Sequence, residues 1–371
     1  MLSLAKTAAL TAILALAISA TSAVSAPSPQ DAASRIRDEI ERLQKTVSAK
    51  PVADPDWKEA KPELTALLSQ ARGSLRADRL YLSLQELEQA RSELRALEAT
   101  KQPGAAQSGM PGFESAWKKA SVELTAGNPP TRAGSASPVA FRALAETASG
   151  QTRVLLAASR SYAGATSPTA GLYYLGQAEG AAESARFCSS LPAPPLTAGR
   201  LGLPLRSVAP ELRQLQERTV AAFTPPRSIE RHGDFITLNA TLKLAGELDA
   251  AGLYAGALYQ YLDALQQFGR IDLPAPDDAR KAAVRRALDQ LEIRLRGSRR
   301  DDSLAELFSE RAEGVLAGRR DRLPNPNDWR NAAVLVEQVL PAYFAWREAP
   351  APQSPPAGHP IVVTLVRWPY T

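Results

Sequence analysis

The chain has 371 residues and a formal net charge of +5, and it contains one Cys and two His. A single Cys excludes an intrachain disulfide framework, and the scarcity of Cys and His excludes metal sites rich in either residue. Ala and Leu are abundant whereas aromatic residues make up 6%, so the composition favours helices over sheets. We therefore expect an all-α protein without a metal or a cofactor.

Residues 1–26 are typical of a secretory signal peptide. Lys6 gives the segment a positive start, residues 10–18 form an uncharged apolar run, and small residues follow. The apolar stretch is shorter than the roughly 20 residues that span a bilayer, which argues against a retained membrane anchor. The single Cys, Cys188, is too far away to be a lipoprotein attachment site. We expect an exported protein, periplasmic or extracellular, with no other transmembrane segment.

Beyond the signal segment, amphipathic stretches alternate with breaks rich in Pro, Gly and Ser. Apolar residues at helical spacing predict an N-terminal helical bundle over residues 27–100, in which we expect Pro62 to break the second helix. Residues 101–138 are typical of a linker that carries one short helix. The main helical domain is predicted over residues 139–348, with helices near 139–163, 168–190, 210–223, 236–251, 253–268, 276–297, 302–317 and 327–348.

Two segments have the pattern of β-strands. Leu alternates with Gly and Pro in residues 201–208, and residues 361–367 are rich in β-branched side chains. The second segment belongs to a Pro-rich spacer and strand-like tail over residues 349–371. We expect the two segments to pair as a minor two-stranded element, because an isolated strand leaves its backbone groups unpaired. The alternative is that the tail adds a strand to another chain.

Residues 241–269 combine small and aromatic residues in the order expected for a packed helical hairpin. The small residues would let two helices approach closely. The positions concerned are Leu244, Ala245, Gly252, Tyr254, Ala257, Tyr261 and Ala264. This pattern resembles a tetratricopeptide repeat, although Thr241, Leu248 and Gly269 depart from the motif. The resemblance implies an irregular helical-repeat array that binds protein or peptide, whereas an ordinary multi-helix bundle is the alternative.

Two sets of side chains are candidates for binding. Tyr254 and Tyr259 would line a groove if the hairpin presents a concave face, whereas we expect Tyr261 to fill the gap between neighbouring hairpins. Arg285 and Arg286 belong to a basic amphipathic helix suited to a membrane surface, although oppositely charged residues at i,i+4 spacing favour a solvated outer face. The basic residues form no concentrated stripe, so we do not expect nucleic acid as a partner.

One polar cluster has residues suited to acid–base chemistry. Glu230, His232 and Asp234 lie close in sequence, and such groups exchange protons when held together. The alternative is a turn in which Asp234 caps the following helix. The sequence contains no phosphate-binding glycine loop and no G-x-S-x-G nucleophile motif. Cys188 lies near the end of an apolar helix, so we expect a buried structural thiol.

These observations favour a protein that is not an enzyme. We expect a protein- or peptide-binding or scaffold component of the bacterial cell envelope, with another envelope protein or peptide as its partner. One alternative is an α-helical toroid-type enzyme acting on envelope polysaccharide, which would need paired carboxylates beside aromatic platforms in one cleft. The other alternative is a structural homodimer joined through the C-terminal tail.

Overall fold

The computed structural model describes residues 31–51, 54–101, 108–126, 137–192, 201–223, 231–317 and 324–349. These residues are mostly helical and none of them belongs to a strand, which confirms the all-α fold class. Residues 201–208, one half of the predicted two-stranded element, run as extended coil. The other half, residues 361–367, lies outside the described residues.

The backbone and side chains of residues 201–208 are used by the helices around them. Leu201 forms an isolated parallel bridge with Arg300, and Leu203 is buried in the core. The backbone N–H of Val208 donates to Asp249 at 2.8 Å, at the start of a helix. Leu201–Arg300 is an isolated bridge, so the minor β element is not seen in the described part of the chain.

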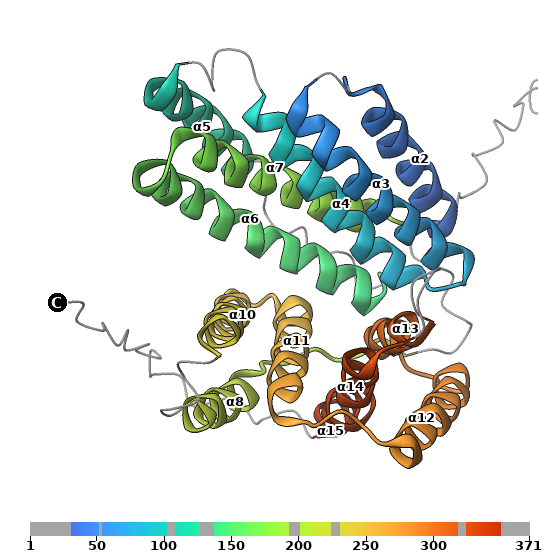
Figure 1. Ribbon diagram of the computed structural model, residues 1–371. Coiled ribbons are helices and arrows are strands. Elements are labelled where there is room, and N and C mark those ends of the chain that lie inside the picture. The colour runs from blue at the N-terminus through green and yellow to red at the C-terminus, as the bar shows by residue number, and fades with distance from the viewer. Residues whose placement is uncertain are drawn as a thin grey trace, which may run out of the picture.

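Two layers of helices pack against each other, as Figure 1 shows. The first layer holds α2 (Ala32–Ala49), α3 (Pro55–Arg76), α4 (Leu80–Thr100), α5 (Gly109–Ala126), α6 (Val139–Ala165) and α7 (Pro168–Ser190). The second layer holds α8 (Ala209–Ala222), α10 (His232–Ala250), α11 (Tyr254–Asp272), α12 (Asp278–Arg296), α13 (Ser303–Ala317), α14 (Pro326–Val334) and α15 (Leu340–Glu348), with a π-helical turn at Leu335–Val339 before α15.

Pro62 lies inside α3 without ending it, so the predicted break is wrong. Proline removes one backbone donor and leaves the carbonyl one turn earlier without its usual partner. Pro62 is on the exposed side of the helix, where water can solvate that carbonyl. The opposite side of α3 is held against the core by the buried side chains of Trp57, Leu64 and Leu68. Packing of this face keeps the helix continuous through the proline.

Helices α4 and α7 approach each other closely because two glycines of α7 face the backbone of α4. A Cβ atom at Gly176 would lie 2.3 Å from the carbonyl oxygen of Arg95, and one at Gly180 would lie 2.7 Å from the Cα of Ser92. Backbone atoms cannot move aside as the end of a flexible side chain can. The spacing of these two glycines puts them on one face of α7, so they set the distance between the two helices.

One hydrophobic core joins the two layers. It includes side chains that are at most 1% exposed from α4, α6, α11, α13 and α15, among them Leu87, Leu144, Leu258, Phe308 and Tyr343. Full burial of an aliphatic or aromatic side chain contributes about 1.5–3 kcal/mol relative to exposure. Because both layers supply residues to the same core, each depends on the other for its stability.

The predicted hairpin over residues 241–269 lies on α10 and α11. The chain turns at Gly252 with φ +75°, a conformation that glycine adopts without steric cost. Ala245 of α10 and Ala257 and Ala264 of α11 are fully buried, which allows the helices to pack closely. The structure therefore contains the helical hairpin that the small residues predict.

Three helix N-termini at the junction of the layers lack a side-chain cap of their own. None of α4, α6 and α11 receives a hydrogen bond from the side chain of its N-cap residue. Carboxylates from the opposite layer accept hydrogen bonds from the free N–H groups, at 2.7–2.8 Å. The pairs are Glu310 with Leu82, Asp301 with Val139, and Glu146 with Gly256.

Glu310 makes the stability of this junction depend on pH. Burial, reinforced by the negative charge of Glu306, raises the pKa of Glu310 to about 8, although the N–H of Leu82 opposes this. The folded chain therefore holds this proton more tightly than the unfolded chain. The resulting stabilisation is complete below about pH 4.5 and is lost as the pH rises through about 8.

We expect Glu310→Gln to remove this part of the pH dependence, because an amide keeps an acceptor oxygen for Leu82 and carries no charge. For the unaltered chain, the free energy of unfolding should fall by on the order of 4 kcal/mol between about pH 5 and about pH 9 because of Glu310. Urea denaturation of both chains at the two pH values measures the difference. Parallel pH profiles for the two chains would contradict the role given to Glu310.

Candidate binding site

The structure places the two predicted binding tyrosines in different surroundings. Tyr254 is partly buried at the first turn of α11. Tyr259 is 5% exposed, and its hydroxyl accepts a hydrogen bond from Arg311. Residues five positions apart in a helix point in different directions, so the pair does not line one groove. Tyr261 packs against the hydrophobic core and is partly buried.

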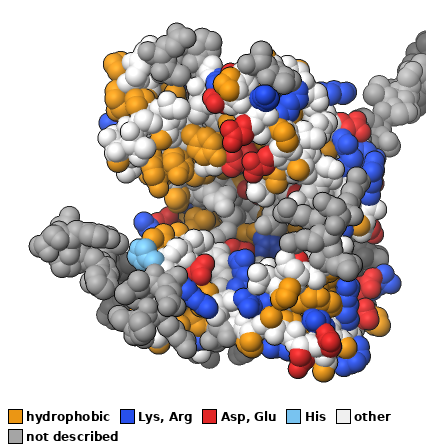
Figure 2. Space-filling view, in the orientation of Figure 1, with side chains coloured by type: hydrophobic (Ala, Val, Ile, Leu, Met, Phe, Trp, Pro, Cys, Tyr) orange, Lys and Arg blue, Asp and Glu red, His pale blue; other side chains and the backbone are white. Residues whose placement is uncertain are grey.

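Arg285 and Arg286 are exposed on α12. The guanidinium of Arg285 lies 5.4 Å from the centre of the Trp329 ring, within cation–π range. Other cations of this helix pair with carboxylates, and Figure 2 shows basic and acidic side chains interspersed over this part of the second layer; the pairs are Arg280–Glu337, Arg294–Glu348 and Arg296–Glu292. Helix α12 therefore presents a salt-bridged outer surface.

The predicted polar cluster is not assembled in the described residues. Glu230 lies outside them, and His232 and Asp234 are both exposed in the first turn of α10. The N-cap residue of this helix is Arg231, so the predicted capping role of Asp234 is wrong. The helix starts earlier than predicted and places Asp234 inside its first turn. Cys188 is 1% exposed, and burial raises the pKa of its thiol.

A polar cavity of about 240 Å³ lies where α11 of the second layer meets α4, α6 and α7 of the first. Half of its lining residues come from α4, and Tyr259 is the contribution of α11. The lining residues are Gln85, Glu88, Gln89, Ser92, Glu93, Leu144, Thr147, Gln151, Ala181 and Tyr259. Amide, carboxylate and hydroxyl groups outnumber apolar side chains, so the cavity is suited to a ligand that forms several hydrogen bonds.

Glu88 is the titratable centre of this cavity. Burial raises the pKa of Glu88 to about 7, although the positive charges of Arg91 and Arg311 act in the opposite direction. Neither of these guanidinium groups donates a hydrogen bond to Glu88. Arg91 donates to Ser184 and Glu39, both at 2.8 Å. The carboxyl group of Glu88 thus faces the cavity without a hydrogen-bond partner among the described residues.

Arg311 holds one side of the cavity together. Its guanidinium donates to Gln85 of α4 at 2.8 Å, to Asp263 of α11 at 2.9 Å and to the Tyr259 hydroxyl. Arg311 is itself in α13, so one side chain links three helices from both layers. Its positive charge is compensated by Asp263, and none of its hydrogen bonds goes to Glu88.

Thr147 adds an unsatisfied hydroxyl to the cavity wall. Its side chain is 3% exposed, and its Oγ1 atom has no hydrogen-bond partner in the described part of the chain. Thr152 on the same helix behaves differently, because its hydroxyl donates to the carbonyl of Ala148 at 2.8 Å. An unpaired buried hydroxyl costs about 1–3 kcal/mol.

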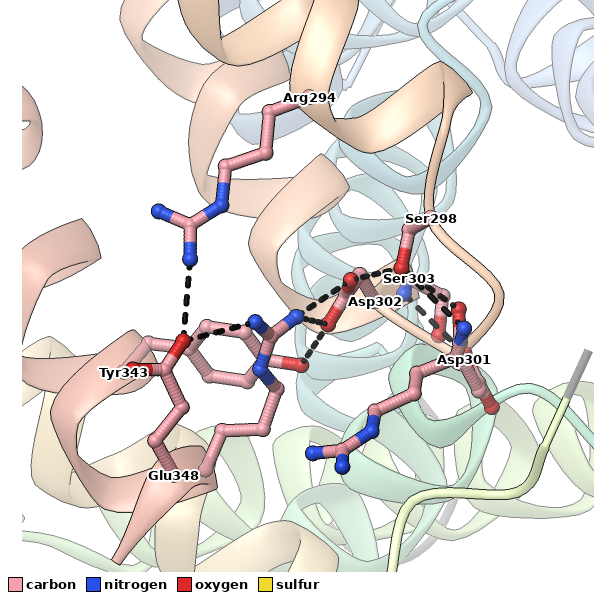
Figure 3. A network of polar contacts seen from close by, with 9 residues as sticks. Arg294, Ser298, Asp301, Asp302, Ser303, Tyr343 and Glu348 are labelled. Atoms are coloured by element: carbon pink, nitrogen blue, oxygen red, sulfur yellow. Dashed lines mark hydrogen bonds and ion pairs between the residues drawn. The ribbon is translucent and has the colours of Figure 1, made fainter.

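A second buried carboxylate, that of Asp302, serves a structural role (Figure 3). Arg347 donates to it at 2.7 and 2.8 Å, the Tyr343 hydroxyl at 2.9 Å and the Ser298 hydroxyl at 2.5 Å. These four bonds use the acceptor positions of both oxygens. The network ties the turn before α13 to α15 and leaves no position open for a ligand.

Sequence reasoning missed the residues of the cavity wall. Gln85, Glu88, Gln89 and Ser92 follow the i, i+3, i+4, i+7 spacing of one helical face, which is visible in the sequence. The same pattern is typical of a solvated helix surface, and only the second layer turns it into a cavity wall. Among the predicted site residues that the structure describes, only Tyr259 lines this cavity.

The fold and the cavity define an all-helical protein with a polar cavity between two helical layers. Comparisons with protein-family models, with curated proteins and with solved structures find no match for the chain. In the described ranges, no three His, Cys, Asp or Glu residues are grouped as they would be to hold a metal ion. Nor does any helix there have the length and apolar character needed to cross a membrane.

Proposed function

We propose that the chain is an exported binding protein of the bacterial cell envelope that holds a segment of another protein or a peptide in the cavity between its two layers. The observation that carries this proposal is the carboxyl group of Glu88, a residue that lines the cavity and has no hydrogen-bond partner among the described residues. Thr147, in the same wall, has a buried hydroxyl that is also unpaired. Side-chain amides at Gln89 and Gln151 both donate and accept, as the backbone of a bound peptide requires.

The resemblance of residues 241–269 to a tetratricopeptide repeat supports the same proposal, because that family binds protein or peptide. The second helix of this hairpin, α11, contributes Tyr259 to the cavity. The hairpin would thus act as one wall of the binding site. The exposed basic face of α12 is the competing location, and Arg285 and Arg286 would then carry the contact to a partner or to a membrane surface.

Site-specific photocrosslinking tests the proposal. A photoreactive amino acid at position 89, on the cavity wall, should capture a partner in the native envelope. The same amino acid at position 286, on the outer face of α12, is the matched control and should capture none. Capture from position 286 and none from position 89 would overturn the proposal and move the binding site to α12.

An enzyme acting on envelope polysaccharide is the second candidate, and one observation favours it. Glu88 and Glu93 both line the cavity, and glycoside hydrolysis uses a pair of carboxyl groups. Against it, no Trp is among the described residues that line the cavity, and Glu93 already accepts a hydrogen bond from Tyr173 at 2.6 Å. Release of reducing ends from envelope polysaccharide by the purified chain, and its loss in Glu88→Gln, would establish this function instead.

A further inference from the structure

We infer that the cavity is specific for a cationic group, the lysine or arginine side chain of a bound peptide, which Glu88 and Thr147 recognise together. This inference rests on the proposed peptide-binding function and adds the chemical class of the ligand. Three features carry it: an acceptor that no internal cation satisfies, a second unsatisfied polar group on another helix, and a cavity of suitable size.

The first feature is the missing partner of Glu88. A partly buried carboxylate is ordinarily paired, because removing a charge from water is costly. Arg91 is turned away to Ser184 and Glu39, and its guanidinium lies 5.0 Å from the centre of the Phe187 ring. Arg311 directs its hydrogen bonds to Gln85, Asp263, Gln266 and Tyr259 and donates none to Glu88. The position of a counter-ion to Glu88 is therefore open on the cavity side, and a ligand cation would fill it.

The second feature is the hydroxyl of Thr147, which α6 contributes while α4 contributes Glu88. An ammonium group has three donors and no acceptor, and a guanidinium group has five donors. Either would pair with the carboxylate and still donate to a hydroxyl and to an amide oxygen. The glutamine side chains at 89 and 151 supply such oxygens in the same cavity. A neutral donor could hydrogen-bond to Glu88 but would leave its negative charge without a counter-ion.

The third feature is size. A cavity of about 240 Å³ lies below the roughly 300–1,000 Å³ of pockets that enclose drug-sized ligands. It therefore fits a single long side chain better than a whole peptide. We expect the rest of a peptide to lie outside the cavity, with one cationic side chain inserted.

Binding should depend on pH through Glu88. The titratable and charged groups around it are Arg91 and Glu93 of its own helix, Cys188 of α7, Tyr259 and Asp263 of α11, and Arg311 of α13. With a pKa of about 7, the ionised fraction of Glu88 rises from about one-tenth at one pH unit below to about nine-tenths at one unit above. A lysine stays charged throughout, so its affinity should rise about tenfold over these two pH units.

Two amino-acid derivatives of similar shape provide the probes. Nα-acetyl-lysine amide carries the side-chain cation, and its Nε-acetylated form does not. In titration calorimetry at about pH 8, the purified chain should bind the cationic probe at least tenfold more tightly than the neutral one. Glu88→Gln should abolish this difference, and Glu217→Gln, on the exposed surface of α8, is the matched control that should retain it.

Thr147→Val separates recognition from folding. Removing an unpaired buried hydroxyl should leave the free energy of unfolding unchanged or raise it, yet it should weaken binding of the cationic probe severalfold. Equal binding of the two probes, or no binding of the cationic one, overturns the cation inference. In that case, capture of a partner from position 89 would still support the proposed function. If position 89 captures no partner, the proposed function is wrong, whichever probe binds more tightly.

Discussion

Gly176→Ala is expected to lower the free energy of unfolding by about 2–3 kcal/mol, although alanine ordinarily favours a helix over glycine. The added Cβ would lie 2.3 Å from the carbonyl oxygen of Arg95 and 2.7 Å from the Cα of Ala96. Both are backbone atoms of α4, so the two helices must separate to relieve the contact. Chemical denaturation of the two chains measures the effect.

The control for this prediction is a glycine with the same local conformation and free space around it. Gly246 lies within α10, and a Cβ there would meet nothing within 4 Å. Gly246→Ala should therefore stabilise the chain by about 0.5–1 kcal/mol through helix propensity alone. If both substitutions change stability in the same direction, close helix approach does not explain the role of Gly176.

The second large effect is expected at Asp302. Asp302→Ala should lower the free energy of unfolding by about 3–5 kcal/mol, because it leaves Arg347 as a partly buried cation without its main partner. It also removes the acceptor of the Tyr343 hydroxyl. Denaturation at neutral pH checks the size of the loss.

A double-substituted chain distinguishes a lost ion pair from lost packing at this position. Arg347→Met removes the cation, so the Asp302→Ala and Arg347→Met substitutions together should cost clearly less than the sum of the two alone. Additive losses would show that the pair contributes nothing specific and that the cost comes from the cavity left at residue 302.

The helices could be predicted because their N-cap residues and the spacing of their apolar residues act over only a few positions in the sequence. The side chain of Asp54 accepts a hydrogen bond from the N–H of Asp56, and that of Ser167 accepts one from Ala170, as their sequence positions suggest. Pro62 shows the limit of such signals, because packing of the other face of α3 outweighs the local cost. The ends of α4, α6 and α11 show the same limit, since their caps come from residues that are more than 100 positions away.

The site could be predicted only in part, for a related reason. The hairpin pattern in the sequence indicates Tyr259, but the surroundings of its side chain depend on Arg311, which lies 52 positions further on. Glu88 carries no local signal of function, because its pKa is set by burial under another layer. The cation-binding role proposed for Glu88 depends on the fact that Arg91 and Arg311 form hydrogen bonds to other residues and none to Glu88.

If the cavity between the layers is the binding site, a side chain that fills the cavity should weaken binding of the partner. Gln151→Trp places a large ring at the cavity wall, and Arg286→Trp places the same ring on the outer face of α12. The measurement is the affinity of each chain for the partner captured by photocrosslinking, at matched thermal stability. We predict at least a tenfold loss for Gln151→Trp and no loss for Arg286→Trp; full affinity of the Gln151→Trp chain would contradict the account.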